Sequence, residues 1–323
     1  MSNVVHGESC MFVQNRSARL LFPAGKVLSV YNSVTGKVFK EGVDYTVSAD
    51  GKEIRLTEAS SIPFFTQADM YPVDAIYYPD PAANAVPDKD GRNIRFDAKL
   101  FFAENQIEVD YEPVVEDWPQ GSFLPSEFRP QQPIRKIVTL GDSITEGYNA
   151  SAYIGREPFR KPYAGLVADA LGAELVNLGL NGASSRYLQK VMEKTVAEKP
   201  DLITIAFGMN DLETLTPQEY IQEIDNAVSY FRKELPGTAL LLVSPMTGNG
   251  EWHHTPVEAT KRFSEALQEY AKQEKLPFAD VYSVWYFAVT RKDFFSLTGN
   301  GVNHPNDFGH SIYAKVILAT LGC

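Results

Sequence analysis

The sequence of 323 residues predicts two parts of different fold class, an all-β region followed by a larger α/β region. The first 110 residues show short alternating or β-branched runs, separated by turn signals, and no helical periodicity. From residue 134 onward, short apolar runs alternate with helical stretches, which is typical of a parallel sheet between helices. We therefore expect a β-sandwich at residues 1–112, a proline-rich linker at 113–133 and a three-layer α/β domain at 134–323.

The β-sandwich is expected to be of the jelly-roll type, because its strands are short and turn signals such as Thr35-Gly36 and Asp90-Gly91 separate them. The expected strands are 18–21, 26–31, 44–48, 53–57, 94–102 and 106–111, with a loop at 60–89. The linker holds five prolines, and this composition favours an extended strap lying over a surface.

The α/β domain is expected to place its functional residues beyond the carboxyl ends of its strands, as parallel sheets do. The expected strands are 136–140, 174–178, 202–207, 239–244 and 278–281. The expected helices are 163–171, 186–198, 217–235, 256–273 and 308–321. Polar motifs follow the first three strands, so the motifs and the topology agree.

The most informative motif is Gly-Asp-Ser-Ile-Thr-Glu-Gly at residues 141–147, directly after the first of these strands. A serine at a strand end, flanked by glycines that permit a tight turn, presents its hydroxyl where a nucleophile is needed. The spacing differs from the Gly-x-Ser-x-Gly elbow of α/β-hydrolases. Taken alone, the run also fits a loop in which Asp142, Ser143 or Thr145 caps the next helix.

Three further blocks, at residues 177–185, 208–211 and 303–307, follow in the order typical of SGNH (GDSL-type) hydrolases. The chain resembles this family from about residue 134 to its end. The resemblance implies a flavodoxin-like fold with Ser143 as nucleophile and His304 as base. It also implies an oxyanion hole formed by the N–H groups of Ser143 and Gly182 and by the side chain of Asn210. A β-sandwich before such a domain resembles two-domain carbohydrate esterases.

The chain departs from the family at the acid, because the usual aspartate three residues before the histidine is replaced by Gly301. Another group has to accept the Nδ1–H of His304, so that Nε2 can take the serine proton. The backbone carbonyls of Asn300, Gly301 and Val302 are the favoured acceptors, as in the Ser–His dyads of some carbohydrate esterases of this superfamily. The side chain of Asn300 or Asn303, or an acid from elsewhere, are the alternatives.

Substrate contacts are expected from Asp142, from Tyr153 in the loop after the nucleophile, and from Trp252 and His253. Trp252 is suited to stack on a sugar ring. The pair His253-His254 also invites a metal interpretation, but no third ligand accompanies it at regular spacing. We therefore expect no metal and no cofactor.

These residues favour a serine esterase that removes short acyl groups from a small-molecule or oligosaccharide substrate. The resemblance to two-domain carbohydrate esterases implies that the substrate carries acetyl esters, most plausibly O-acetyl groups on a carbohydrate. The alternatives are a lipid or thioester acylhydrolase on the same scaffold and a non-catalytic sugar-binding protein. The net charge of −11 argues against nucleic acid or an anionic membrane as a partner.

The two cysteines, Cys10 and Cys323, exclude a disulfide framework. The first residues lack the charged start and apolar core of a signal peptide, which predicts a cytoplasmic protein. Removal of a leader from a secreted protein would leave the same pattern.

Overall fold

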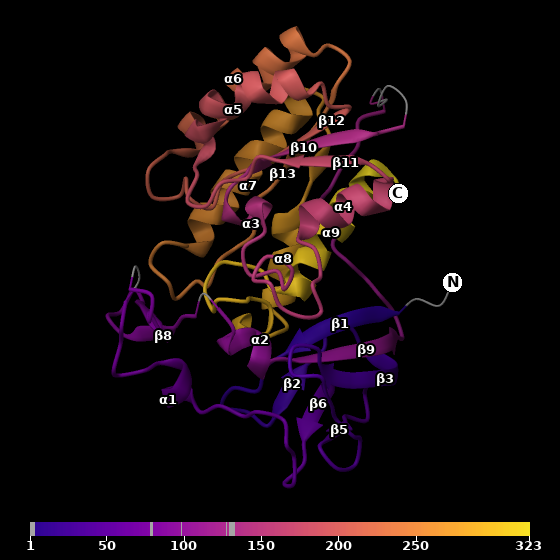
Figure 1. Cartoon of the computed structure of the whole chain (residues 1–323), viewed down its shortest axis with the longest axis vertical. Coiled ribbons are helices and arrows are strands. Elements are labelled where there is room, and N and C mark those ends of the chain that lie inside the picture. The colour runs from indigo at the N-terminus through magenta and orange to yellow at the C-terminus, as the bar shows by residue number, and fades with distance from the viewer. Residues whose placement is uncertain (1–3, 78–79, 98, 127, 129–132) are drawn as a thin grey trace.

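The computed structural model describes residues 4–77, 80–97, 99–126, 128 and 133–323 (Figure 1). Its C-terminal part is built on a five-stranded parallel sheet with the strand order β11-β10-β12-β13-β14. Along the chain this order reads 2-1-3-4-5, as in flavodoxin-like folds. The strands are β10 (Lys136–Gly141), β11 (Glu174–Asn177), β12 (Leu202–Ala206), β13 (Ala239–Val243) and β14 (Phe278–Ala279). The predicted α/β class is confirmed.

Helices cover both faces of this sheet, because alternate strand residues point to opposite sides. Val138 and Ile203 belong to a core that includes α5, α6 and α7, whereas Ile137 and Leu241 belong to a core that includes α4, α8 and α9. The helices are α4 (Tyr163–Leu171), α5 (Leu188–Glu198), α6 (Pro217–Glu234), α7 (Val257–Gln273), α8 (Val281–Val289) and α9 (Asp307–Leu321). In the described part of the chain, no helix has the length and apolar character needed to cross a membrane.

Most helix boundaries agree with the sequence prediction because local signals define them. Helix α6 begins with a capping box between Thr216 and Glu219, with Pro217 at its first position. Helix α8 was not predicted, since its sequence is apolar at nearly every position and shows no amphipathic stripe. Asp280 caps this helix by accepting the N–H of Ser283 at 3.0 Å.

The N-terminal part contains antiparallel sheets, consistent with a β-sandwich. One sheet has the order β1-β9-β3-β4, a second has β2-β6-β5, and β7 pairs with β8. Val30 and Val109 of the first sheet share a core with Ile54 of the second. The strands are β1 (Val5–Cys10), β2 (Ser17–Arg19), β3 (Ala24–Asn32), β4 (Lys37–Val38), β5 (Tyr45–Val47), β6 (Glu53–Leu56), β7 (Ala85–Pro87), β8 (Asn93–Arg95) and β9 (Ile107–Pro113).

The expected strand at 94–102 is wrong beyond its first residues. Strand β8 ends at Arg95, and helix α2 (Phe101–Asn105) follows. Tertiary packing overrides the strand preference of the aromatic residues here, because the Phe102 ring stacks on Phe295 with centroids 5.9 Å apart. The expected loop at 60–89 holds helix α1 (Gln67–Met70) and strand β7. Strands β1 and β4 were not predicted.

The linker lies along the α/β domain where the structure describes it. Phe123 exchanges two backbone hydrogen bonds of 3.0 Å with Phe278 of β14. The Trp118 ring lies 4.9 Å from Phe22 and 5.8 Å from Phe287, measured between centroids. Linker residues 127 and 129–132 lie outside the described residues, and the domain boundaries stay a prediction.

The two parts of the chain meet through buried polar contacts as well as apolar ones. Lys292, in the loop after α8, places its Nζ 2.6 Å from Oε1 of Glu8 in β1, and both side chains are almost completely buried. Gln106 donates from Nε2 to the carbonyl of Phe295 at 2.6 Å. A buried charge is tolerated only when it is paired. The Lys292–Glu8 contact therefore favours a single position of the N-terminal β-sheet against the C-terminal part of the chain.

Candidate active site

Ser143 is the first residue of helix α3 (Ser143–Glu146), which begins two residues after the end of strand β10. The turn is tight: a Cβ atom on Gly141 would lie 1.9 Å from Thr145 Oγ1 and 2.7 Å from the Ala206 carbonyl oxygen. Asp142 caps the helix by accepting the N–H of Ile144 at 2.9 Å. As the first helical residue, Ser143 has a backbone N–H without an acceptor inside the helix.

His304 reaches this serine from the loop before α9. Its Nε2 lies 2.9 Å from Ser143 Oγ. The loop is shaped by Asn300, whose Oδ1 accepts the backbone N–H groups of Val302, Asn303 and His304 at 3.0 Å each. The structure thus brings together the two residues that the sequence proposed as nucleophile and base.

The other imidazole nitrogen faces Asn149, with 2.9 Å between His304 Nδ1 and Asn149 Oδ1. Asn149 has a left-handed backbone conformation with a φ of 62°. Its Nδ2 donates to the Gly299 carbonyl at 3.2 Å, which leaves Oδ1 to accept from the histidine. Nδ1 therefore carries the proton, and Nε2 is free to accept one from Ser143.

The expected backbone acceptor for His304 is wrong. The three candidate carbonyls accept other donors: Asn300 from the Asp97 N–H, Gly301 from Asn249 Nδ2, and Val302 from the Asn249 N–H. The side chains of Asn300 and Asn303 are also engaged, with 2.9 Å between Asn300 Nδ2 and Asn303 Oδ1. The sequence did not predict Asn149 as the acceptor, because this residue precedes the histidine by 155 residues. Its position two residues after the first motif was the available signal.

Gly182 and Asn210, the other two candidate oxyanion residues, line one cavity of about 300 Å³. Gly182 has a φ of 73°, and a Cβ atom there would meet nothing within 4 Å, so its backbone is open to a ligand. Asn210 Nδ2 donates to the Ala183 carbonyl at 3.0 Å. Asp211 holds the two blocks together, since its Oδ1 accepts both the N–H and the hydroxyl of Ser185 at 2.9 and 2.6 Å.

Of the residues expected to contact substrate, some line the cavity and others lie outside it. Trp252 lines the cavity, whereas His253 is exposed and lies near the Pro87 carbonyl. The Tyr153 ring packs at a tilt against Tyr148, with centroids 4.7 Å apart, and the Tyr148 ring lies against His304 with centroids 5.2 Å apart.

The expected substrate contact of Asp142 is wrong, because its carboxylate is buried and lines a separate cavity of about 10 Å³ beside Tyr313. Burial, with a smaller contribution from Asp211, raises the pKa of Asp142 to about 7.

Electrostatics favour a neutral histidine at the site. Burial, together with the neighbouring His310, lowers the pKa of His304 to about 3. Burial likewise lowers the pKa of His310 to about 4, and this residue lies against Tyr163 in the core. A neutral imidazole can accept a proton at neutral pH, which is what a general base requires.

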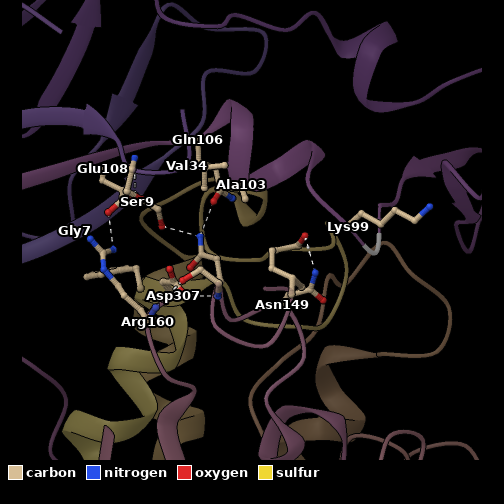
Figure 2. A pocket seen from close by; sticks show the side chains of 16 residues that line it. Gly7, Ser9, Val34, Lys99, Ala103, Gln106, Glu108, Asn149, Arg160 and Asp307 are labelled. Carbon is tan, nitrogen blue, oxygen red and sulfur yellow. Dashed lines mark hydrogen bonds and ion pairs between the residues drawn. The ribbon is translucent and has the colours of Figure 1, made fainter. Parts of the chain in front are cut away.

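The loop that carries Asn149 is anchored in both parts of the chain (Figure 2). The Ser151 N–H donates to Asp307 Oδ1 at 2.8 Å, and the Arg160 N–H donates to Ser151 Oγ at 2.8 Å. The Arg160 guanidinium lies 2.5 Å from Glu108 Oε2 of strand β9. These residues and Asn149 line a cavity of about 40 Å³ between the β-sheet and the loop.

Residues 139–312, more than half of the chain, match the model of the GDSL-like Lipase/Acylhydrolase family. A GDSL esterase/lipase of Arabidopsis thaliana is 31% identical over 129 residues, which cover 34% of this chain and 50% of that protein. An acetylxylan esterase of Geobacillus stearothermophilus is 24% identical over 207 residues, which cover 58% of this chain and 94% of that protein. The chain thus spans about half the length of the first relative and nearly all of the second.

Several solved structures are similar to part of this chain. The acetylxylan esterase Axe2 of Geobacillus stearothermophilus is 20% identical with a TM-score of 0.48, covering 59% of this chain and 97% of that one. A putative GDSL-like lipase from Parabacteroides merdae is 22% identical with a TM-score of 0.48, covering 58% and 97%. On the match of its residues 139–312, the chain belongs to the GDSL-like lipase/acylhydrolase family.

Proposed function

We propose that this protein is a serine esterase that hydrolyses short-chain esters, above all acetyl groups on carbohydrates. The observation that carries the proposal is the distance of 2.9 Å between Ser143 Oγ and His304 Nε2. A hydroxyl in contact with a neutral imidazole is the arrangement that activates a serine for attack on an acyl carbon.

In the proposed reaction, Ser143 Oγ attacks the ester carbonyl while its proton passes to His304 Nε2. The N–H groups of Ser143 and Gly182 and the amide of Asn210 donate to the oxyanion of the tetrahedral intermediate. His304 then gives the proton to the leaving alcohol. Water, activated by the same histidine, hydrolyses the acyl-serine and regenerates the hydroxyl.

Asn149 takes the position of the usual acid in this proposal, as a positioning residue. An amide facing a histidine is harmful when its NH₂ group points at Nδ1, because the imidazole then adopts the wrong tautomer. Here the Asn149 Nδ2 donates to the Gly299 carbonyl, so the oxygen faces the ring. A Cβ atom on residue 299 would lie 2.6 Å from Asn149 Cβ, so Gly299 permits this close approach.

The carbohydrate part of the proposal is supported by the cavity beside Asn210. Trp252 and Glu213 line it, and an aromatic face with nearby polar groups is suited to a sugar ring. The name of the Geobacillus relative, acetylxylan esterase, supports an acetyl ester as substrate.

Acetate release from acetylated xylo-oligosaccharides, compared with hydrolysis of nitrophenyl esters from acetyl to palmitoyl, tests this function. We expect turnover of acetyl esters that falls with chain length, and loss of turnover in Ser143→Ala. Preference for long acyl chains would instead support a lipid acylhydrolase. Binding of the oligosaccharide without any turnover by the wild-type chain would support a sugar-binding protein.

A further inference from the structure

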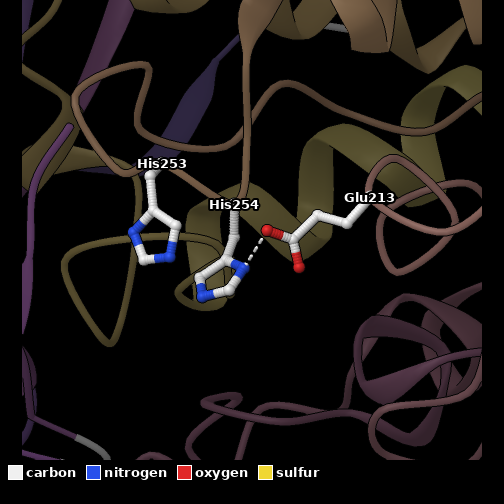
Figure 3. A group of neighbouring side chains, drawn as sticks. All are labelled: Glu213, His253 and His254. Atoms are coloured by element: carbon white, nitrogen blue, oxygen red, sulfur yellow. Dashed lines mark ion pairs between the residues drawn. The ribbon is translucent and has the colours of Figure 1, made fainter.

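Three side chains of types that can bind a metal ion lie together at the edge of the cavity, outside the Ser143–His304 pair. They are Glu213, His253 and His254, and one ligand atom from each lies within 4.8 Å of the other two (Figure 3). Glu213 precedes the histidine pair by 40 residues, so spacing along the sequence did not reveal it. We propose that these three residues bind one divalent transition-metal ion, for which Zn²⁺ is the best match.

The donor set fits zinc. Two imidazoles and one carboxylate, with a fourth position left open, form a recurrent zinc coordination set. Ligand atoms around a tetrahedral zinc ion lie about 3.4 Å apart, given bonds of ~2.1 Å. The observed limit of 4.8 Å therefore requires side-chain shifts of about 1 Å. Glu213 and His253 are exposed and have the freedom to make such shifts.

The contacts of the two histidines leave nitrogen atoms available for an ion. His254 Nδ1 already touches Glu213 Oε1, so an ion bound there would replace the proton between them. His253 Nδ1 lies 3.4 Å from the Pro87 carbonyl oxygen. A backbone carbonyl at one ring nitrogen is the usual outer partner of a metal-bound histidine, and it directs the other nitrogen, Nε2, to the ion.

The loop that carries the pair is held in place by backbone contacts. The Lys89 N–H donates to the Glu251 carbonyl, and the Trp252 N–H donates to the Asn249 carbonyl, both at 2.9 Å. The Trp252 ring packs edge-on against His254, with centroids 4.9 Å apart. The loop that carries the two histidines is thus already partly ordered for metal binding in the folded chain.

The position of the cluster indicates what the ion would do. His254 and Glu213 line the same cavity of about 300 Å³ as Asn210. The proposed ion would therefore lie at the edge of this cavity, where a bound substrate could reach its open coordination position. An oxygen ligand of the substrate, either a hydroxyl or a carboxylate group, is the chemistry that fits this position.

Isothermal titration calorimetry of the metal-free full chain with zinc chloride alone tests the site. We expect one ion per chain, with binding weakened about tenfold or more in His253→Ala, His254→Ala and Glu213→Gln. His6→Ala is the matched control, because its side chain is 75% exposed and contacts Asp110 in the first β-sheet. This variant should bind zinc as the wild type does. Cobalt chloride should give the visible absorption of a four-coordinate ion, and each cluster variant should lose it.

Three outcomes would overturn the proposal. The first is the absence of stoichiometric zinc binding, in which case Glu213 and His254 form only a hydrogen-bonded pair. The second is full affinity in any one of the three cluster variants. The third is binding that persists in all three but disappears in His304→Ala, which would assign the ion to the Ser143–His304 pair. The substituted cluster residues are exposed or partly exposed, so circular dichroism should show wild-type folding.

Discussion

The Nδ1 atom of His304 lies 2.9 Å from Oδ1 of Asn149, an amide that precedes it by 155 residues. A neutral amide can orient the imidazole, but it cannot stabilise the imidazolium as a carboxylate would. Burial and the neighbouring His310 lower the pKa of His304 to about 3, and the uncharged Asn149 amide does not offset this shift. At this site the Asn149 amide thus orients the His304 ring without stabilising the charged imidazolium. These two effects can be tested separately.

Removal of the Asn149 amide should lower kcat with little change in KM. In Asn149→Ala we expect kcat to fall about 10²–10⁴-fold, because the His304 imidazole loses the acceptor that selects its tautomer. Asn149→Asp keeps an acceptor, so it should retain far more activity than Asn149→Ala. Steady-state kinetics on an acetyl ester checks both variants. An Asn149→Ala variant as active as the wild type would contradict the positioning role.

The pH profile should report the neutral state of His304. With a pKa of about 3, the imidazole is ready to accept a proton throughout the range from pH 5 to 8, so kcat/KM should have no acid limb near 6.5. In Asn149→Asp, a carboxylate beside the ring favours the charged imidazolium. The acid limb should then move to higher pH. A wild-type limb near pH 6.5 would show that the histidine has an ordinary pKa.

The site was predictable from sequence where local motifs define it. Ser143 follows a strand in a short glycine-flanked turn, and His304 precedes a helix whose N-cap, Asn306, is a recognisable signal. The parallel sheet was predictable for the same reason, because each strand is a separate apolar run.

The sequence did not predict contacts between residues that only tertiary packing brings together. Asn149 meets His304 only because the loop after α3 folds back against Gly299. Glu213 meets His254 only because two loops end at the same edge of the sheet. The helical state of Phe101 and Phe102 likewise depends on packing, here against Phe295.

The buried carboxyl of Asp142 should make stability depend on pH. Its folded pKa is about 7, and the unfolded value is about 3.9, so its stabilising contribution is full below pH 4 and is lost as the pH rises through 7. Asp142→Asn keeps the helix cap and removes the titration. We expect the free energy of unfolding of this variant, relative to the wild type, to rise between pH 5 and pH 8 in urea titrations. Parallel pH dependence in the two proteins would contradict burial of the charge.

The Asn210 amide should matter as an oxyanion donor. Loss of one such donor lowers kcat about 10²–10³-fold. We therefore expect Asn210→Ala to lose kcat by a factor in that range and to bind product with wild-type affinity. Asn181→Ala is the matched control, because Asn181 is exposed in the neighbouring block and is not among the cavity-lining residues. Equal kinetics in the two variants would remove Asn210 from the oxyanion hole.

The contact between Arg160 and Glu108 should couple the β-sheet to catalysis. Arg160 lies near the end of the loop that carries Asn149, and Glu108 belongs to strand β9. Breaking their 2.5 Å contact therefore frees the loop at one anchor. Since small displacements of positioned groups are costly, we expect Glu108→Gln and Arg160→Gln each to lower kcat roughly tenfold.

The double variant distinguishes this coupling from separate local effects. If the two residues act only through each other, Glu108→Gln with Arg160→Gln should lose no more activity than either single variant. Lys161→Ala is the matched control, because Lys161 pairs with Asp169 at the exposed surface next to Arg160. It should keep wild-type kcat. Additive losses in the double variant, or an equal loss in Lys161→Ala, would show that the β-sheet does not position the Asn149 loop through this contact.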